Sequence, residues 1–361
     1  MNEPFFSVLL PTRNRSEIVP GAIQSILGQS FDDFELVISD NDESPEATRN
    51  AVAAFRDPRI RYFRTSGDLP MHDNWEHARR QALGRWLLVV EDKQRLTPTA
   101  LATLHGICRD HPGSLVSYPP VNACADHLAG PSGAPDVQRF TCEQVVEEFC
   151  RFSPLFWNIF PRGLTSATPR AVMDAIASCS PTGMVFSWVN PDYAYGFQAL
   201  SRAPDLWFVN EDIIYVPLSV GRTGRYSNGL SGARKEAQAR KFFASLPVPE
   251  SEFLGDVPVP TLWLWVNPVL YDFRKFYRRP GHTPSVDWIG YFAQCGHIIL
   301  VGREWGADMS DEIRLWWTAL KRRGPIFLSR VLFRIGIRSV KGLAGRLKNR
   351  LRHRDLGQAA S

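Results

Sequence analysis

Residues 5–15 read Phe-Phe-Ser-Val-Leu-Leu-Pro-Thr-Arg-Asn-Arg, an apolar run that ends in polar and basic side chains. A short apolar run closed by Pro11 is typical of a strand buried in a sheet. Ser16 follows, and its hydroxyl is placed to cap a helix over residues 17–28 that carries one apolar face. The chain is therefore predicted to begin with a strand, a polar turn and a helix.

The same alternation continues over the first 120 residues. We predict further strands over 34–38, 60–63, 86–90 and 115–118, and further helices over 45–56, 73–83 and 98–109. Strands and helices that alternate at short spacing give a parallel sheet with right-handed crossovers and helices on its faces. The predicted fold class is therefore α/β, with a Rossmann-like, mostly parallel sheet.

Polar side chains follow three of these predicted strands. In a parallel sheet of this kind, ligands bind beyond the carboxyl ends of the strands. No glycine-rich loop follows the first strand, which argues against a P-loop, a dinucleotide site and a nucleotidyltransferase. The polar residues are Thr12, Arg13 and Asn14 after the first strand, Asp40 and Asp42 after the second, and Glu91, Asp92 and Lys93 after the fourth.

The composition is that of a globular protein. The 361 residues are 44% hydrophobic and 22% charged, which excludes disordered, collagen-like and coiled-coil chains. The six cysteines form no C-x-x-C pair, so we expect no zinc ribbon. The N-terminus lacks the basic region of a signal peptide, and no segment is apolar enough to span a membrane. We therefore expect a cytoplasmic protein.

The charge is distributed unevenly along the chain. Residues 321–361 hold twelve Lys or Arg and one acid, a net charge of +11, and residues 1–320 hold 30 basic and 36 acidic residues, a net charge of −6. Within this tail, residues 326–352 interleave apolar and basic side chains. A basic amphipathic helix favours an anionic membrane surface. A partner-binding helix, a packed terminal helix and a nucleic-acid tail are the alternatives, and nucleic acid is not the expected partner.

Several motifs of the first hundred residues keep a fixed order and spacing. They are Ser7–Arg15, Ser25–Phe31, Phe34–Asp42, Asp57–Tyr62, Asn74-Trp75 and Gly84-Arg85-Trp86. Together they resemble the family 2 glycosyltransferases of the GT-A fold. The resemblance is specific over about residues 5–105, weak to about residue 230 and absent beyond it. It implies a nucleotide-sugar-binding half over residues 1–120 and an acceptor-binding half over 121–245. From the residues themselves we expect a helical C-terminal region over 246–361 that ends in the basic tail.

The resemblance also implies an activity. Enzymes of this family transfer a sugar, with inversion, from a nucleotide diphosphate donor to a hydroxyl group. We expect a UDP-sugar donor and a glycan or lipid-linked acceptor, in the synthesis of a bacterial cell-surface polysaccharide or lipopolysaccharide. A lipid-linked acceptor would place the protein peripherally at the inner face of the cell membrane. A catalytically silent relative that binds a nucleotide sugar or a glycan is the alternative.

The same resemblance assigns residues to the donor. Thr12 and Asn14 would contact the base, Arg13 or Arg15 would lie near the diphosphate, and Asp40 would accept a hydrogen bond from a uracil-type N–H. Turn chemistry and helix capping are the alternative explanation for Asp40 and Asp42. The full donor-binding set is Pro11, Thr12, Arg13, Asn14, Asp40, Asp42, Asp92, Lys93, Arg222 and Arg225.

The end of the fourth strand departs from the family pattern. Lys93 stands where relatives place a metal-binding carboxylate, and hard cations prefer oxygen ligands. In one hypothesis Asp92 and Glu91 still hold Mg²⁺ or Mn²⁺ together with the donor phosphates. In the other, the Lys93 ammonium replaces the metal and neutralises the diphosphate directly. A surface ion pair between Glu91 and Lys93 is the structural alternative.

Inverting transfer needs a base that takes the proton of the acceptor hydroxyl. In the family this base comes from the second half, at the start of a helix, and Asp192 is the candidate, with aromatic neighbours that would raise its pKa. The alternative is that Asp192 is an ordinary residue in the first turn of a helix after Pro191.

Arg222 and Arg225 lie in a loop that could close over the diphosphate, or could be a solvated loop.

Overall fold

The computed structural model describes residues 3–66, 68–120, 133–186, 190–221, 237, 244 and 249–336. Within them, eight strands form one sheet in the order β3-β2-β1-β4-β8-β6-β9-β7, and two short strands form a second sheet. The large sheet consists of β1 (Phe6–Thr12), β2 (Phe34–Asp40), β3 (Ile60–Arg64), β4 (Trp86–Val89), β6 (Leu115–Ser117), β7 (Val137–Thr141), β8 (Ser166–Pro169) and β9 (Asp205–Val209). The small sheet pairs β5 (Arg95–Leu96) with β10 (Ile214–Tyr215).

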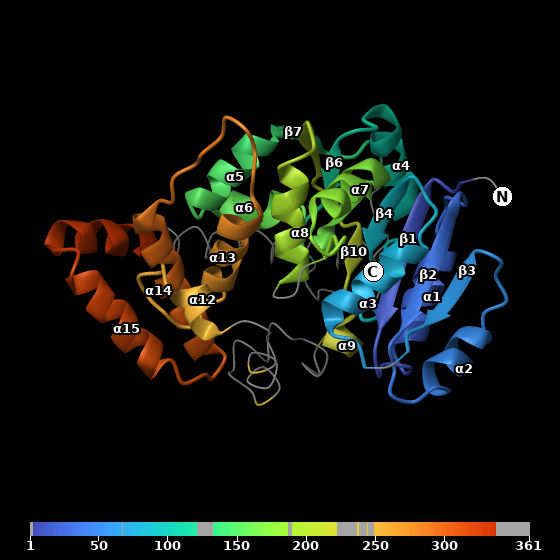
Figure 1. The fold of residues 1–361 in the computed structure, drawn as a ribbon, viewed down its shortest axis with the longest axis horizontal. Helices are drawn as coiled ribbons and strands as arrows, with labels where there is room; N and C mark the ends of the chain where they lie inside the picture. The colour runs from blue at the N-terminus through green and yellow to red at the C-terminus, as the bar shows by residue number, and fades with distance from the viewer. Residues whose placement is uncertain are drawn as a thin grey trace, which may run out of the picture.

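The half of the sheet predicted from the first residues is parallel, as expected. Strand β1 pairs in parallel with both β2 and β4, and β2 pairs in parallel with β3. On the other side of β4, strands β8 and β7 run antiparallel to their neighbours. The predicted α/β class, with a mainly parallel sheet flanked by helices, is confirmed (Figure 1). The carboxyl ends of β1, β2 and β4 consequently meet at one edge.

The two faces of the sheet bury different helices because side chains alternate along each strand. On β1, Val8 and Leu10 join one apolar cluster, and Leu9 joins the other. The Val8 side is covered by α1 (Val19–Leu27), α2 (Ala47–Ala53) and α4 (Ala100–Asp110). The Leu9 side is covered by α3 (Met71–Gln81), α5 (Cys142–Cys150), α6 (Pro154–Ile159), α7 (Arg170–Cys179) and α8 (Pro191–Leu200).

Helix α1 begins later than predicted, and the predicted cap at Ser16 is wrong. The helix starts at Val19 and has no side-chain cap. Instead, the carbonyl oxygen of Arg15 accepts hydrogen bonds from the backbone N–H groups of Ile18 and Val19. A backbone turn thus leads into the helix, and Pro20 in its first turn needs no hydrogen-bond acceptor.

Gly84 sits where two backbones approach closely, just before β4. A Cβ atom at this position would lie 2.6 Å from the backbone nitrogen of Ser7. The Gly84 N–H also donates a hydrogen bond to the Ser7 hydroxyl oxygen at 2.7 Å. This contact places the start of β4 against β1, and it explains physically why a glycine stands in this motif.

The C-terminal region is helical, as expected. It contains α12 (Glu250–Leu254), α13 (Val266–Phe276), α14 (Trp288–Glu304), α15 (Ser310–Lys321) and a last helix over 325–336, called the terminal helix below. These helices form the end of the molecule farthest from the N-terminus (Figure 1). The side chain of Phe273 on α13 packs against Phe149 of α5 and Phe197 of α8, with ring centroids 5.1 and 5.5 Å apart. The region therefore shares one core with the sheet.

No helix in the described part of the chain has both the length and the apolar character needed to cross a bilayer. The predicted tail over 326–352 is described only as far as residue 336, and its remainder lies outside the described residues.

Candidate active site

Three strand ends bring Thr12, Asp40 and Asp92 together at one edge of the sheet. Thr12 of β1 is the register partner of Asp40 at the end of β2. The Thr12 hydroxyl donates a hydrogen bond to Asp92 Oδ2 at 2.9 Å, and Arg15 Nη1 contacts Asp92 Oδ1 at 2.8 Å. Burial raises the pKa of Asp92, and the nearby Arg15 guanidinium opposes this effect. Hydrogen bonds thus join the ends of β1 and β4. The polar residues at the ends of β1, β2 and β4 are called the strand-end rim below.

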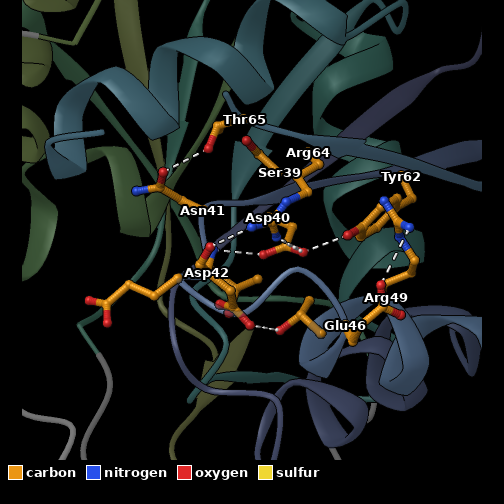
Figure 2. A network of polar contacts seen from close by, with 12 residues as sticks. Ser39, Asp40, Asn41, Asp42, Glu46, Arg49, Tyr62, Arg64 and Thr65 are labelled. Carbon is orange, nitrogen blue, oxygen red and sulfur yellow. Dashed lines mark hydrogen bonds and ion pairs between the residues drawn. The ribbon is translucent and has the colours of Figure 1, made fainter. Parts of the chain in front are cut away.

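Asp40 is fully buried in a polar network at the end of β2 (Figure 2). Its Oδ1 accepts a hydrogen bond from the backbone N–H of Asp42 at 2.8 Å. Its Oδ2 accepts one from the Tyr62 hydroxyl and one from Arg64 Nη1, the latter at 3.1 Å. Both carboxylate oxygens thus have partners within the chain. Asp40 therefore stabilises the turn that follows β2, which was the alternative explanation for this residue. A contact of Asp40 with a nucleotide base stays a prediction.

Asp42 joins the second strand end to the turn after β1. It accepts hydrogen bonds from the Thr48 hydroxyl at 2.6 Å and from the backbone N–H of Asn14. Asn14 has a positive φ of 53°, a left-handed conformation that asparagine adopts more easily than most residues. Its Oδ1 accepts the N–H of Glu43 at 2.9 Å. The side chain of Asp42 therefore holds the shape of the turn on which Arg13 stands.

Arg13 lies at the exposed rim of the site. Its guanidinium forms ion pairs with Asp68 at 2.5 Å and with Glu43 at 3.4 Å. All three side chains are at least 40% exposed, so water screens these pairs and each is worth little. A more highly charged anion could therefore draw Arg13 away from them at a small energetic cost.

The end of β4 contains the ion pair named as an alternative for Glu91 and Lys93. Lys93 Nζ lies 2.9 Å from Glu91 Oε2, and both side chains are 20% exposed. Asp92 is already bound by Thr12 and Arg15. Among the described residues no group of three or more His, Cys, Asp or Glu side chains could hold a metal ion. Because each candidate carboxylate already faces a cation, the residues of this strand end fit a divalent metal poorly.

Asp192 lies in the first turn of α8, directly after Pro191. Its Oδ1 accepts the N–H of Tyr193 at 3.0 Å. Burial raises the pKa of Asp192, the Arg162 guanidinium lowers it, and the Glu91 carboxylate raises it. The 3₁₀ turn η1 (Gly163–Thr165) contacts both β4 and α8, and a Cβ atom on Gly163 would lie 3.6 Å from the Cα of Asp192. The start of α8, which carries Asp192, therefore lies near β4, and a raised pKa is the direction of shift that suits a general base.

A buried acid of the C-terminal region contacts the residue at the N-terminus of α8. Asp272 of α13 is fully buried, and its Oδ2 accepts a hydrogen bond from Asn190 Nδ2 at 3.0 Å. Its Oδ1 is buried without a hydrogen-bond partner among the described residues. Burial raises the pKa of Asp272 well above its usual range, and Asp192 adds to this shift. Asp272 thus fixes the start of the helix that carries Asp192.

Aromatic rings surround this helix start. Tyr193 stacks on Phe160 with centroids 5.6 Å apart, and the Arg162 guanidinium lies 5.7 Å from the Tyr193 ring. Trp157 contacts Trp265 edge-on at 4.5 Å, and Trp265 is 40% exposed. Aromatic faces of this kind can stack against a sugar ring and exclude water from it.

The predicted site residues fall into two groups. The structure brings these predicted residues to one edge of the sheet: Pro11, Thr12, Arg13, Asn14, Asp40, Asp42, Glu91, Asp92 and Lys93. Asp192 lies in the first turn of α8, and the turn Gly163–Thr165 contacts both α8 and β4. Arg222 and Arg225, the predicted lid, lie outside the described residues. Sequence reasoning missed Arg162 and Asp272, because only tertiary packing brings them near Asp192. It gave no role to Asn190, whose hydrogen bond to Asp272 also depends on tertiary packing.

Comparison with known proteins finds relatives of the N-terminal part of the chain. Residues 7–124 match the family model described as "Glycosyl transferase family 2". The GalNAc(5)-diNAcBac-PP-undecaprenol beta-1,3-glucosyltransferase of Campylobacter jejuni is 35% identical over 104 residues, which are 28% of this chain and 33% of that protein. The putative colanic acid biosynthesis glycosyl transferase WcaA of Escherichia coli is 30% identical over 102 residues, 28% of this chain and 37% of that protein. The chain thus spans about a third of the length of these curated relatives.

A similarity to a solved structure covers more of the chain at lower identity. The crystal structure of S. aureus TarS 1–349 in complex with UDP aligns with a TM-score of 0.48 and 14% identity, and the alignment covers 89% of this chain and 92% of that one. The sheet order described above and the matched family model agree with the predicted GT-A fold. Residues 7–124, about a third of the chain, are thus similar to glycosyl transferase family 2.

Proposed function

We propose that the protein transfers a sugar from a nucleotide diphosphate donor, with a UDP-sugar favoured, to a hydroxyl of a glycan or lipid-linked acceptor, with inversion. The observation that supports the proposal is the position of Asp192: the turn η1 (Gly163–Thr165) contacts both the helix that begins beside Asp192 and strand β4, which ends next to Glu91, Asp92 and Lys93. A candidate base thus lies on an element near the donor-side residues. The names of the Campylobacter and Escherichia relatives support a role in bacterial surface glycan synthesis.

In the proposed reaction the Asp192 carboxylate takes the proton of the acceptor hydroxyl. The hydroxyl oxygen forms a bond to the anomeric carbon as the bond between that carbon and the diphosphate oxygen breaks. The nucleoside diphosphate leaves with the bonding electrons, on the face opposite to the attack, which inverts the configuration. Lys93 and Arg15 supply positive charge where the negative charge of the leaving group develops.

We also propose that the transfer proceeds without a divalent metal. The support is the chemistry of the strand end, where Lys93 pairs with Glu91 and where Arg15 and Thr12 occupy Asp92. The acceptor class and the inner face of the cell membrane as the place of reaction belong to the same proposal. They are supported by the undecaprenol-linked acceptor in the name of the Campylobacter relative.

The test of this function is a panel of nucleotide sugars with the full chain. We expect one UDP-sugar to raise the thermal unfolding temperature and to be turned over to UDP when a glycan acceptor is present. Neither Mn²⁺ nor EDTA should change the result. Binding without any release of UDP, either to an acceptor or to water, would instead identify a catalytically silent relative.

The pH dependence of transfer should depend on Arg162. Because this guanidinium lowers the pKa of Asp192, the Arg162→Gln variant should raise it, and the base should become protonated at a higher pH. The acid limb of the kcat/KM profile should therefore move to higher pH. Arg162→Lys retains the charge and should leave the limb in place. Equal limbs for Arg162→Gln and the parent protein would contradict the assignment of Asp192.

A further inference from the structure

The terminal helix is packed on the protein through one face. Val331 is fully buried, and Phe327 contacts Phe292 of α14 edge-on with centroids 5.4 Å apart. Arg334 forms an ion pair with Asp287, the capping residue of α14. These contacts hold the helix in one orientation, so its opposite face points into solvent.

The outward face of this helix is apolar where a soluble protein usually carries polar residues. Ile326 and Phe333 are each 72% exposed, among the most exposed large apolar side chains of the described chain. They stand seven residues apart, and Arg330 lies between them on the same face of the helix. Leu332 beside them is 49% exposed. The helix thus has a packed apolar face and a second apolar face that is exposed.

A similar stripe runs along α15. Ile313 and Trp317 are 37% and 38% exposed, and they are followed at the same spacing of four residues by Lys321. The Lys321 ammonium lies 5.8 Å from the Trp317 ring. A tryptophan next to a lysine is typical of side chains that lie at the boundary between lipid and water.

The charge of this surface has one sign from Trp317 onward, beyond the acidic first turn of α15. From Trp317 to residue 336 the sequence holds five Lys or Arg and no Asp or Glu. Arg334 is turned inward to Asp287, and the other four, Lys321, Arg322, Arg323 and Arg330, are exposed. Apolar side chains flanked by these cations are complementary to a surface with an apolar interior and anionic head groups.

We propose that the outer faces of α15 and the terminal helix dock on an anionic lipid bilayer. Ile326, Phe333 and Trp317 insert at the boundary of the acyl chains, and the four exposed cations contact lipid phosphates. The docking surface lies at the end of the molecule away from the parallel strands (Figure 1). This inference does not depend on the transferase reaction, since it concerns a surface that contains none of the proposed catalytic residues.

The experiment is sedimentation of the full chain with vesicles of phosphatidylglycerol and phosphatidylcholine, compared with vesicles of phosphatidylcholine alone. We expect binding to the anionic vesicles that weakens as salt is raised. The double variant Ile326→Ser, Phe333→Ser should bind at least about tenfold more weakly. Each charge removed, for example by Arg330→Gln, should weaken binding about fivefold.

The matched control removes exposed apolar side chains elsewhere. Leu83 and Leu155 are 46% and 39% exposed, and the double variant Leu83→Ser, Leu155→Ser should bind vesicles as the parent does. Unchanged thermal unfolding should show that both double variants fold. Equal vesicle binding by the parent and by Ile326→Ser, Phe333→Ser would overturn the proposal. A halved molar mass of that variant in light scattering, without any effect of lipid on the parent, would show a dimer interface instead.

Discussion

Replacing Asp192 with asparagine is expected to lower kcat for sugar transfer by about 10²–10⁴-fold, the usual contribution of a positioned general base. The asparagine side chain has the same size, and its amide oxygen can still accept the hydrogen bond that the Tyr193 N–H donates to Asp192 Oδ1 in the parent protein. It cannot accept a proton from the acceptor hydroxyl. Turnover should therefore fall while folding and donor affinity are retained, as measured by product formation, thermal unfolding and UDP titration.

The control for this variant is a carboxylate far from the chemistry. Asp311 lies in the first turn of α15, is 73% exposed and pairs only weakly with the exposed Arg314. Asp311→Asn should retain full turnover with a soluble acceptor. If Asp192→Asn kept more than about a third of the parental kcat, Asp192 would be a helix residue without a part in the proton transfer.

Replacing Lys93 with alanine is expected to lower kcat by about 10²–10³-fold, the loss seen when one group that stabilises developing charge is removed. The variant also leaves Glu91 without the Lys93 ammonium, which lies 2.9 Å from it in the parent protein. The uncompensated carboxylate would repel the diphosphate, so donor affinity should fall as well. Arg109→Ala, an exposed cation on α4 paired with its neighbour Asp110, is the matched control.

A second variant at this position distinguishes the two hypotheses about metal. Lys93→Asp places an oxygen ligand beside Glu91 and Asp92, so its activity should be absent in EDTA and should appear when Mn²⁺ is added. The parent protein should transfer sugar equally well in both conditions. Complete loss of parental activity in EDTA, with recovery in Mn²⁺, would show that Glu91 and Asp92 hold an ion despite Lys93.

Three strands of the parallel half, β1, β2 and β4, could be predicted because they are buried on both faces. Such strands read as continuous apolar runs, and each run at residues 5–10, 34–38 and 86–90 became a strand at that place. The second half could not be divided in the same way. There β8 and β7 pair antiparallel with strands distant in sequence, and such pairing leaves no local signal. The two-residue strands β5 and β10 exist only through their contact with one another.

The residues of the candidate site likewise divide into those that the sequence could predict and those that it could not. The rim residues could be predicted because they directly follow strands whose ends meet at one edge. The turn chemistry of Asp40 and Asp42, left open as an alternative, depends on Tyr62, Arg64 and Thr48, which come from other elements. The partners of Asp192 were beyond prediction. Arg162 precedes it by thirty residues and Asp272 follows it by eighty, and no periodicity connects them.

The hydrogen bond between Asp272 and Asn190 ties the start of α8, which carries the proposed base, to a helix well beyond residue 124, the last residue matched by the family model. Under the proposed function, residues 7–124 alone would keep the donor-side residues but lack the element that carries the base. Changes in α13 would then alter the alignment of the base with the acceptor and leave the donor side unchanged.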